Sequence, residues 1–246
     1  MDRMLYLAMS GAKQTMQAQA SATNNLANVN TTGFKADLAA ARSMPVFGEG
    51  HASRVYAMTE RPGINFAAGS AQFTGNELDF AINGDGFIAV QSADGSEAYT
   101  RRGDMKINAN GLLENGAGQL VMGEGGPIAL PPSAKIQIGV DGIISVQPLG
   151  QAVNTLAQVD RIKLVNPVLK DIQKSEDGLF RMKDGSEAQA DAVVQVIPGS
   201  LESSNVNAVA EMVNMINLQR QFEMQVKAMK AVEENDESAT QMMRMA

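Results

Sequence analysis

The spacing of apolar residues predicts a long helix near the start of the chain. Between residues 5 and 26, the side chains that suit a helix seam recur at alternating steps of four and three, which is the 3.5-residue period of a coiled coil. Ala and Gln fill the middle of this seam and bury little apolar surface. At about 25 cal/mol per Å², such a helix cannot recover its own ordering entropy and needs a second helix. The seam positions are Leu5, Met9, Ala12, Met16, Gln19, Thr23 and Leu26.

The far end of the chain repeats this spacing. Residues 206–234 contain no Gly or Pro, and at about 1.5 Å per residue they predict a rod of roughly 40 Å. We expect this helix to begin after the capping residues at 203–205. Its acidic end at 233–237 is expected to fray unless a partner covers it, because a helix C-terminus favours cations. We predict that the two terminal helices pair. The second seam is Ala208, Met212, Met215, Gln219, Phe222, Val226, Met229 and Glu233.

The first helix leads into an Asn-rich segment, NNLANVNTTGFK at 24–35. Four Asn within seven residues compete with the helix for backbone hydrogen bonds, and Gly33 permits the left-handed conformation that a helix stop requires. Residues 36–47 are compatible with a brief helical continuation, and we interpret residues 43–75 as an extended arm or hairpin. The residues of the predicted helix-to-arm turn are Asn24, Asn25, Asn28, Gly33 and Phe34.

From residue 76 the pattern changes to short apolar runs separated by Asn-Gly and Asp-Gly pairs. These pairs tolerate the positive φ values of tight hairpin turns, and their spacing of about ten residues predicts an antiparallel sheet, sandwich or barrel. The turn pairs begin at Asn83, Asp85, Asp94, Asn110, Asn115, Asp141, Asp177 and Asp184. The predicted strands are 79–82, 87–91, 98–101, 105–108, 112–114, 135–138, 143–146, 160–165, 179–182 and 192–197.

Together these patterns predict a mainly β chain with terminal helices, α+β overall. The N- and C-terminal α-helices pair in a coiled-coil module made of residues 1–42 and 203–246. Residues 43–75 form the arm, and residues 76–202 form a large central antiparallel β domain. A chain of 246 residues is long enough to bury a substantial core in this arrangement.

Composition narrows the classes of partner. The net charge of −7 argues against nucleic acid or an anionic membrane surface as the main partner, since both favour a basic face. No apolar run approaches 18 residues, so we expect no membrane insertion, and the absence of a secretory pattern predicts a cytoplasmic chain by default. The absence of cysteine excludes disulfides and thiolate metal sites. The 16 Met residues suit either helices with several non-identical neighbours or an ordinary Met-rich helical core.

The sequence offers little support for catalysis. The single histidine, His51, has no acidic pair near it, so it is interpreted as a loop residue rather than a catalyst or ligand. The Gly-rich run at 123–132 lacks the Lys and following helix of a phosphate-binding loop. Arg101 and Arg102 are interpreted as a surface or interface pair. Turn residues Asp79, Asp85 and Asp104 are assigned to backbone chemistry. We therefore predict no enzyme activity, no catalytic or metal site and no cofactor.

Three separated motifs resemble the bacterial flagellar rod and hook proteins. The first is the segment NNLANVNTTGFK at 24–35, which resembles the signature that follows the N-terminal helix in that family. The segments at 78–91 and 99–113 are similar to its shared β domain, and residues 201–229 are similar to its C-terminal helix. The opening MDRMLYLAMSGA, the phrases GEGGPIALP, SEDGLF and FEMQVKAM, and the length are most similar to proximal-rod members, with distal-rod members as the alternative.

The resemblance implies a structural subunit of the flagellar basal-body rod, which polymerises into the helical shaft that transmits torque through the periplasm to the hook. It also implies export by the flagellar type III apparatus without a cleaved signal, which replaces the cytoplasmic default. The implied partners are copies of this chain, other rod proteins and the export apparatus. Weak helix seams suit subunits that order only on assembly. The expected subunit-interface residues are Leu5, Met9, Met16, Leu26, Met212, Met215, Phe222, Val226 and Met229.

A second hypothesis comes from a different class of protein. The acidic turns and the two arginines are compatible with a periplasmic β-sheet module that binds or hydrolyses cell-wall glycan, with the helices as a dimerisation stalk. Asp85 and Asp104 would then carry the activity.

Overall fold

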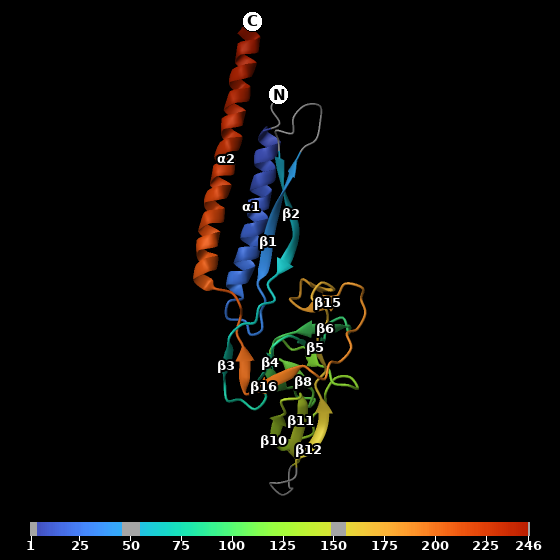
Figure 1. Ribbon diagram of the computed structural model, residues 1–246. Coiled ribbons are helices and arrows are strands. Elements are labelled where there is room, and N and C mark those ends of the chain that lie inside the picture. The colour runs from blue at the N-terminus through green and yellow to red at the C-terminus, as the bar shows by residue number, and fades with distance from the viewer. Residues whose placement is uncertain (1–3, 46–54, 149–155, 246) are drawn as a thin grey trace. The chain divides into compact units, whose positions relative to one another are not determined.

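The computed structural model describes residues 4–45, 55–148 and 156–245, and its chain divides into two compact units (Figure 1). The helical unit comprises Met1–Val29, Lys35–Phe66 and Val206–Ala246, and the β unit comprises Asn30–Phe34 and Ala67–Asn205. The expected fold class is confirmed, because terminal helices flank a large antiparallel β region.

The helical unit is built around α1 (Met4–Ala27), which packs against α2 (Ala208–Met245) on one side and against a β-hairpin on the other (Figure 1). The two helices run antiparallel, since Asn25 hydrogen-bonds to Glu211 while Gly11 faces Gln225. Figure 1 shows the far end of α2 extending beyond the start of α1. No helix among the described residues is both long and apolar enough to cross a membrane.

The hairpin consists of β1 (Asp37–Pro45) and β2 (Val55–Ile64), which pair from Asp37 opposite Ile64 to Pro45 opposite Val55. The expectation of a helical continuation at 36–47 was wrong. The Asn25 side chain accepts from the Asp37 amide (2.8 Å) and donates to its carbonyl (2.9 Å), which turns the chain into an extended strand instead. His51 lies outside the described residues.

Both ends of α2 differ from the expectation. Its first turn is capped by Asn207, whose side-chain oxygen accepts from the amides of Val209 and Ala210 at 3.1 Å, rather than by residues 203–205. The helix also runs through the acidic segment to Met245, beyond the end of the predicted run at residue 234.

The β unit is antiparallel throughout its described strand pairs. Its largest sheet has eight described strands, in the order β14-β15-β6-β5-β9-β8-β7 with β13 beside β5, and β10-β11-β12 form a second sheet. Two short pairs, β16-β4 and β17-β3, complete the described part. The strands are β3 (Ala71–Phe73), β4 (Phe80–Asn83), β5 (Phe87–Gln91), β6 (Glu97–Thr100), β7 (Met105–Ile107), β8 (Leu113–Asn115), β9 (Leu120–Val121), β10 (Ser133–Ile138), β11 (Ile143–Pro148), β12 (Ala157–Arg161), β13 (Leu164–Val165), β14 (Ile172–Lys174), β15 (Phe180–Met182), β16 (Gln195–Pro198) and β17 (Ser200–Glu202).

The core of the β unit is aliphatic, and each of its central side chains is almost fully buried. The sheets bury it because alternate residues of each strand point inward. The turn chemistry matches the sequence at most sites: Gly84, Gly95 and Gly142 all have positive φ. At the Asn115 turn, the positive φ belongs to Gly118 instead of Gly116. The cluster includes Phe80, Ile88, Val90, Leu113, Val121, Ile128, Ile144, Val146, Ile162, Leu164 and Val196.

Candidate functional site

The face of α1 that its neighbours cover carries small side chains. The buried positions have the predicted helical period, but their phase differs from that of the predicted seam by about one residue. The reason is close approach: a β-carbon at Gly11 would lie 3.0 Å from the side chain of Gln225. Small residues are needed where a helix is covered by both a second helix and a hairpin. The buried positions are Ala8, Ala12, Thr15, Ala22 and Asn25.

On α2, five of the eight predicted seam positions are partly buried, namely Ala208, Met215, Phe222, Val226 and Met229. The partly buried residues recur at steps of three and four, and they include four expected interface residues, whereas Met212 lies on the exposed side. Leu26 on α1 is also partly buried. The partly buried face of α2 consists of Ala208, Glu211, Met215, Leu218, Phe222, Gln225, Val226, Met229 and Val232.

Most of the large apolar side chains of α1 are exposed. Leu5, Met9 and Met16 are 42%, 54% and 58% exposed, so the expectation that they face the second helix was wrong. A second exposed group occupies the first turns of α2. We name the exposed residues in the first turns of α1 the N patch (Met4, Leu5, Tyr6 and Met9) and the second group the C patch (Val209, Met212, Val213 and Ile216); Met16 is exposed midway along α1.

The two patches lie at opposite ends of the helix pair. Asn25 of α1 contacts Glu211, so the C patch lies beside the end of α1, while the N patch lies at its start. Exposed apolar patches of this kind mark interaction surfaces on soluble proteins. An apolar surface at each end of one elongated unit suits head-to-tail contacts between copies.

The predicted helix-to-arm turn is divided between the two units. In the helical unit, the Asn28 side chain donates to the Asn24 carbonyl at 2.9 Å and closes the last turn of α1. Asn25 is buried, and its amide group holds both polar groups of the Asp37 backbone and also donates to the carboxylate of Glu211 at 3.2 Å. One side chain therefore joins α1, β1 and α2.

The other half of the turn motif belongs to the β unit. Gly33 has a φ of 66°, as its place in the motif predicted, and its amide donates to the Glu202 carbonyl at 2.8 Å. The ammonium group of Lys174 lies 4.1 Å from the ring centroid of Phe34, a cation–π contact. Sequence spacing alone could not pair Phe34 with Lys174, since they are far apart in the chain.

Arg101 is not the surface residue that the sequence suggested. Its side chain is 4% exposed and forms an ion pair with Glu202 at 3.0 Å. The neighbouring Arg102 binds Asp104 through two hydrogen bonds of 2.7 and 2.8 Å, and the Asp104 hydrogen bond raises the pKa of Arg102. Glu202 carried no sequence signal, because its partner is 101 residues away along the chain.

The acidic turn residues serve the backbone and other side chains. Asp79 is buried and accepts hydrogen bonds from Thr74 and Asn76. Asp104 is engaged by Arg102, while Asp85 is exposed on the turn between β4 and β5. Among the described residues, no group of three or more His, Cys, Asp or Glu side chains could hold a metal ion. The geometry thus gives no support to the glycan hypothesis.

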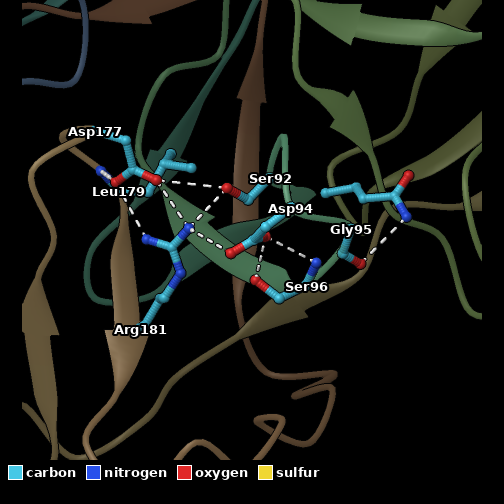
Figure 2. A network of polar contacts seen from close by, with 8 residues as sticks. Ser92, Asp94, Gly95, Ser96, Asp177, Leu179 and Arg181 are labelled. Carbon is cyan, nitrogen blue, oxygen red and sulfur yellow. Dashed lines mark hydrogen bonds and ion pairs between the residues drawn. The ribbon is translucent and has the colours of Figure 1, made fainter.

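Figure 2 shows a further polar network, in which Arg181 links two turns of the β unit. The guanidinium donates to both carboxylate oxygens of Asp177, at 2.8 and 3.1 Å, and to the Ser92 hydroxyl at 2.6 Å. Burial works to raise the pKa of Asp177, but hydrogen bonds from Arg181 and Leu179 outweigh it and the pKa is lowered. Hydrogen bonds from Ser96 lower the pKa of Asp94. Both carboxylates stay ionised at neutral pH and act as turn anchors.

Tyr99 is a further titratable residue of the β unit, and its pKa is strongly shifted. Its hydroxyl accepts a hydrogen bond from the Ala188 amide at 2.6 Å, and burial raises its pKa to about 12. A phenol that stays neutral and hydrogen-bonded to the backbone is a structural element rather than an acid or base.

The comparisons with known proteins agree along the whole chain. Residues 5–35 match the family of flagella basal body rod proteins, residues 81–146 match the D1 domain of the flagellar hook protein FlgE/F/G, and residues 197–242 match the C-terminal region of the flagellar basal body rod FlgEFG proteins. Relatives named flagellar basal-body rod protein FlgF are 42% identical in Escherichia coli and 41% identical in Salmonella typhimurium, each over 100% of both chains. A rod protein named FlgG from Borreliella burgdorferi is 33% identical over 93% of this chain and 94% of its own.

Proposed function

This chain belongs to the family of flagellar basal-body rod proteins, and we propose that it is a structural subunit of the proximal rod, the shaft that carries torque through the periplasm to the hook. The observation that carries this proposal is the helical unit, which leaves an apolar patch exposed at each end while burying small residues between its helices. Contacts between different patches of successive copies are head-to-tail, and such contacts generate a filament when the rotation from one copy to the next does not close a ring.

The finer parts of the proposal follow from the same role. The partners are copies of this chain and neighbouring rod subunits, and the type III export apparatus delivers the chain without a cleaved signal. The role is non-enzymatic. The similarity of the whole chain to relatives named FlgF favours the proximal rod over the distal rod. The distal rod is the alternative, because relatives named FlgG are 31% and 33% identical to the chain.

The proposal also divides the expected interface residues by role. Phe222 and its partly buried neighbours on α2 face α1 within one copy, whereas Leu5, Met9, Met16 and Met212 are free to contact other copies. Substitutions in the two groups therefore test different contacts.

The decisive variant is Ile216→Asp in the C patch, since Ile216 is 52% exposed and its loss leaves the helix pair intact. We expect the variant to be produced with an unchanged β unit, to be missing from isolated basal bodies, and to leave cells non-motile. Gln221→Asp, at an exposed polar position of the same helix, is the matched control and should assemble normally. Phe222→Asp should block assembly as well, by separating α2 from α1. Normal incorporation of Ile216→Asp would contradict the assembly role of the C patch.

A further inference from the structure

The chain passes between its two units four times, after residues 29, 34, 66 and 205, all within described segments. The β unit is therefore attached through three short stretches, which we name the connectors: residues 30–34, 67–70 and 202–205. Any force that passes along the chain from one unit to the other must pass through the connectors. The contacts that hold the connectors to the β unit therefore determine how such a force is transmitted.

A single buried residue, Glu202, holds all three connectors. Its carboxylate accepts a hydrogen bond from the Gly69 amide at 2.9 Å, and its backbone carbonyl accepts one from the Gly33 amide at 2.8 Å. Glu202 itself belongs to the third connector and is 3% exposed. Each connector therefore either contains this residue or donates a backbone hydrogen bond to it.

Arg101 fixes this carboxylate to the body of the β unit. Its Nη1 atom binds the carboxylate at 3.0 Å, while Nε and Nη2 donate to the carbonyls of Gly86 and Gly84 at 2.9 and 2.6 Å. The guanidinium lies 5.5 Å from the ring centroid of Phe87, and that ring contacts Phe180 with centroids 5.2 Å apart. The arginine is held from several sides and cannot swing with its partner.

Two further features tighten the same junction. Thr32 donates to Asp104 at 3.2 Å, and Asp104 is paired with Arg102, so the second arginine of the pair also reaches the first connector. A β-carbon at Gly33 would overlap the Arg101 carbonyl, and one at Gly69 would overlap the Ser203 carbonyl. At Gly33 and Gly69 the connectors therefore pack closely against other backbone, and neither position has room for a side chain.

We infer that Arg101 and Glu202 form a clasp that fastens the connectors to the β unit and carries load between the units; the load itself rests on the rod function proposed above. A buried ion pair is a poor source of net stability, because desolvation offsets most of its attraction. Its directional hydrogen bonds nevertheless hold three backbone segments at one point, which an apolar cluster of equal size does not do.

Hydrogen exchange on the full chain tests the clasp. In Glu202→Gln, which keeps the side-chain shape but removes the charge, the Gly69 and Gly33 amides should exchange about tenfold faster or more. Amides of the β5 strand should keep their rates. The double variant Arg101→Met with Glu202→Leu removes both charges of the pair, so we expect it to fold even if the single variant does not, and it should free the same two amides. Unchanged protection of Gly69 in the folded variants would overturn the clasp.

The chain offers a matched control in another largely buried ion pair of the β unit. Lys163 binds Glu97 at 2.6 Å inside the sheet and touches no connector in the described contacts. Glu97→Gln should loosen the β5 and β6 region and leave the connectors protected. Equal release of the connector amides by Glu97→Gln and Glu202→Gln would show a general loss of stability and overturn the assignment.

The proposed load-carrying role is tested by measuring the swimming speed of cells whose rods contain the variant chains. Cells with Glu202→Gln rods should swim at normal speed in dilute medium and lose speed or break at high viscosity, while Glu97→Gln cells should match the wild type. Normal rotation at high viscosity with the variant rod would overturn the load-carrying role. If the wild-type chain is absent from basal bodies, the rod proposal fails, yet the exchange result still decides whether the clasp exists.

Discussion

The two units of this protein bury opposite kinds of residue. The β unit encloses Ile88, Val90, Leu113 and Val121, which are all fully buried, around a core that needs no neighbour. On α1, the helical unit fully buries only Ala, Thr and Asn side chains, and it leaves several Met and Val side chains of its two helices exposed. Since burial of large apolar side chains supplies most of the folding free energy, we expect the first unit to be stable alone and the second to depend on contacts with other copies. We therefore expect assembly and folding to be coupled in the helical unit only.

The largest expected difference is in hydrogen exchange of the dilute monomer. Amides of β5 and β6 should exchange about a thousandfold more slowly than those of α1 and α2, because local stability follows buried apolar area. In assembled rods, the helix amides should become as slow as those of the sheet. Mass-spectrometric exchange on both forms provides the measurement. Slow exchange of both helices in the monomer would break the comparison, since it would show a helical unit stable without neighbours.

Paired truncations sharpen the contrast. Leu113→Ala in the β unit should lower the free energy of unfolding by about 2–5 kcal/mol, because Leu113 is 0% exposed and its loss leaves a cavity. Met9→Ala in the N patch should change it by less than about 0.5 kcal/mol while reducing incorporation into rods. Urea unfolding of the purified chains measures the first effect, and the protein content of basal bodies measures the second. A loss of monomer stability in Met9→Ala as large as that in Leu113→Ala would contradict the division of roles.

The smallest expected effect is on the pH dependence of the stability of the β unit. The folded-state pKa of Asp177 is below the ordinary value of 3.8, so the Asp177–Arg181 contact stabilises fully above that value and is lost as the pH falls below it. The carboxylate is largely solvated, which limits the contribution to about 0.2–1 kcal/mol. The difference in urea midpoint between wild type and Arg181→Met should therefore shrink from pH 7 to pH 2. An equal difference at both pH values would assign the effect of Arg181 to packing.

Much of the fold was predictable because its signals are local. A helical period and an Asp-Gly turn each depend on neighbouring residues, so the two long helices, the central strands and the left-handed Gly33 were predicted correctly. The shortest strands, such as β9 and β17, were missed because two or three residues carry no alternation. The first strand of the β1–β2 hairpin was missed because residues 36–47 were also compatible with a brief helical continuation, and an arm or hairpin was expected only from residue 43.

By itself, the sequence determined that the terminal helices are amphipathic with a 3.5-residue period, that the middle is antiparallel β, and that the chain resembles rod proteins. Only the tertiary structure decided the phase of α1, because the buried face depends on which neighbours cover a helix rather than on its period. It also decided the pairing of Arg101 with Glu202, which brings together residues far apart in the chain. Neither the buried face of α1 nor the Arg101–Glu202 pair can be predicted from a short segment, since both depend on contacts between segments that are distant in the sequence.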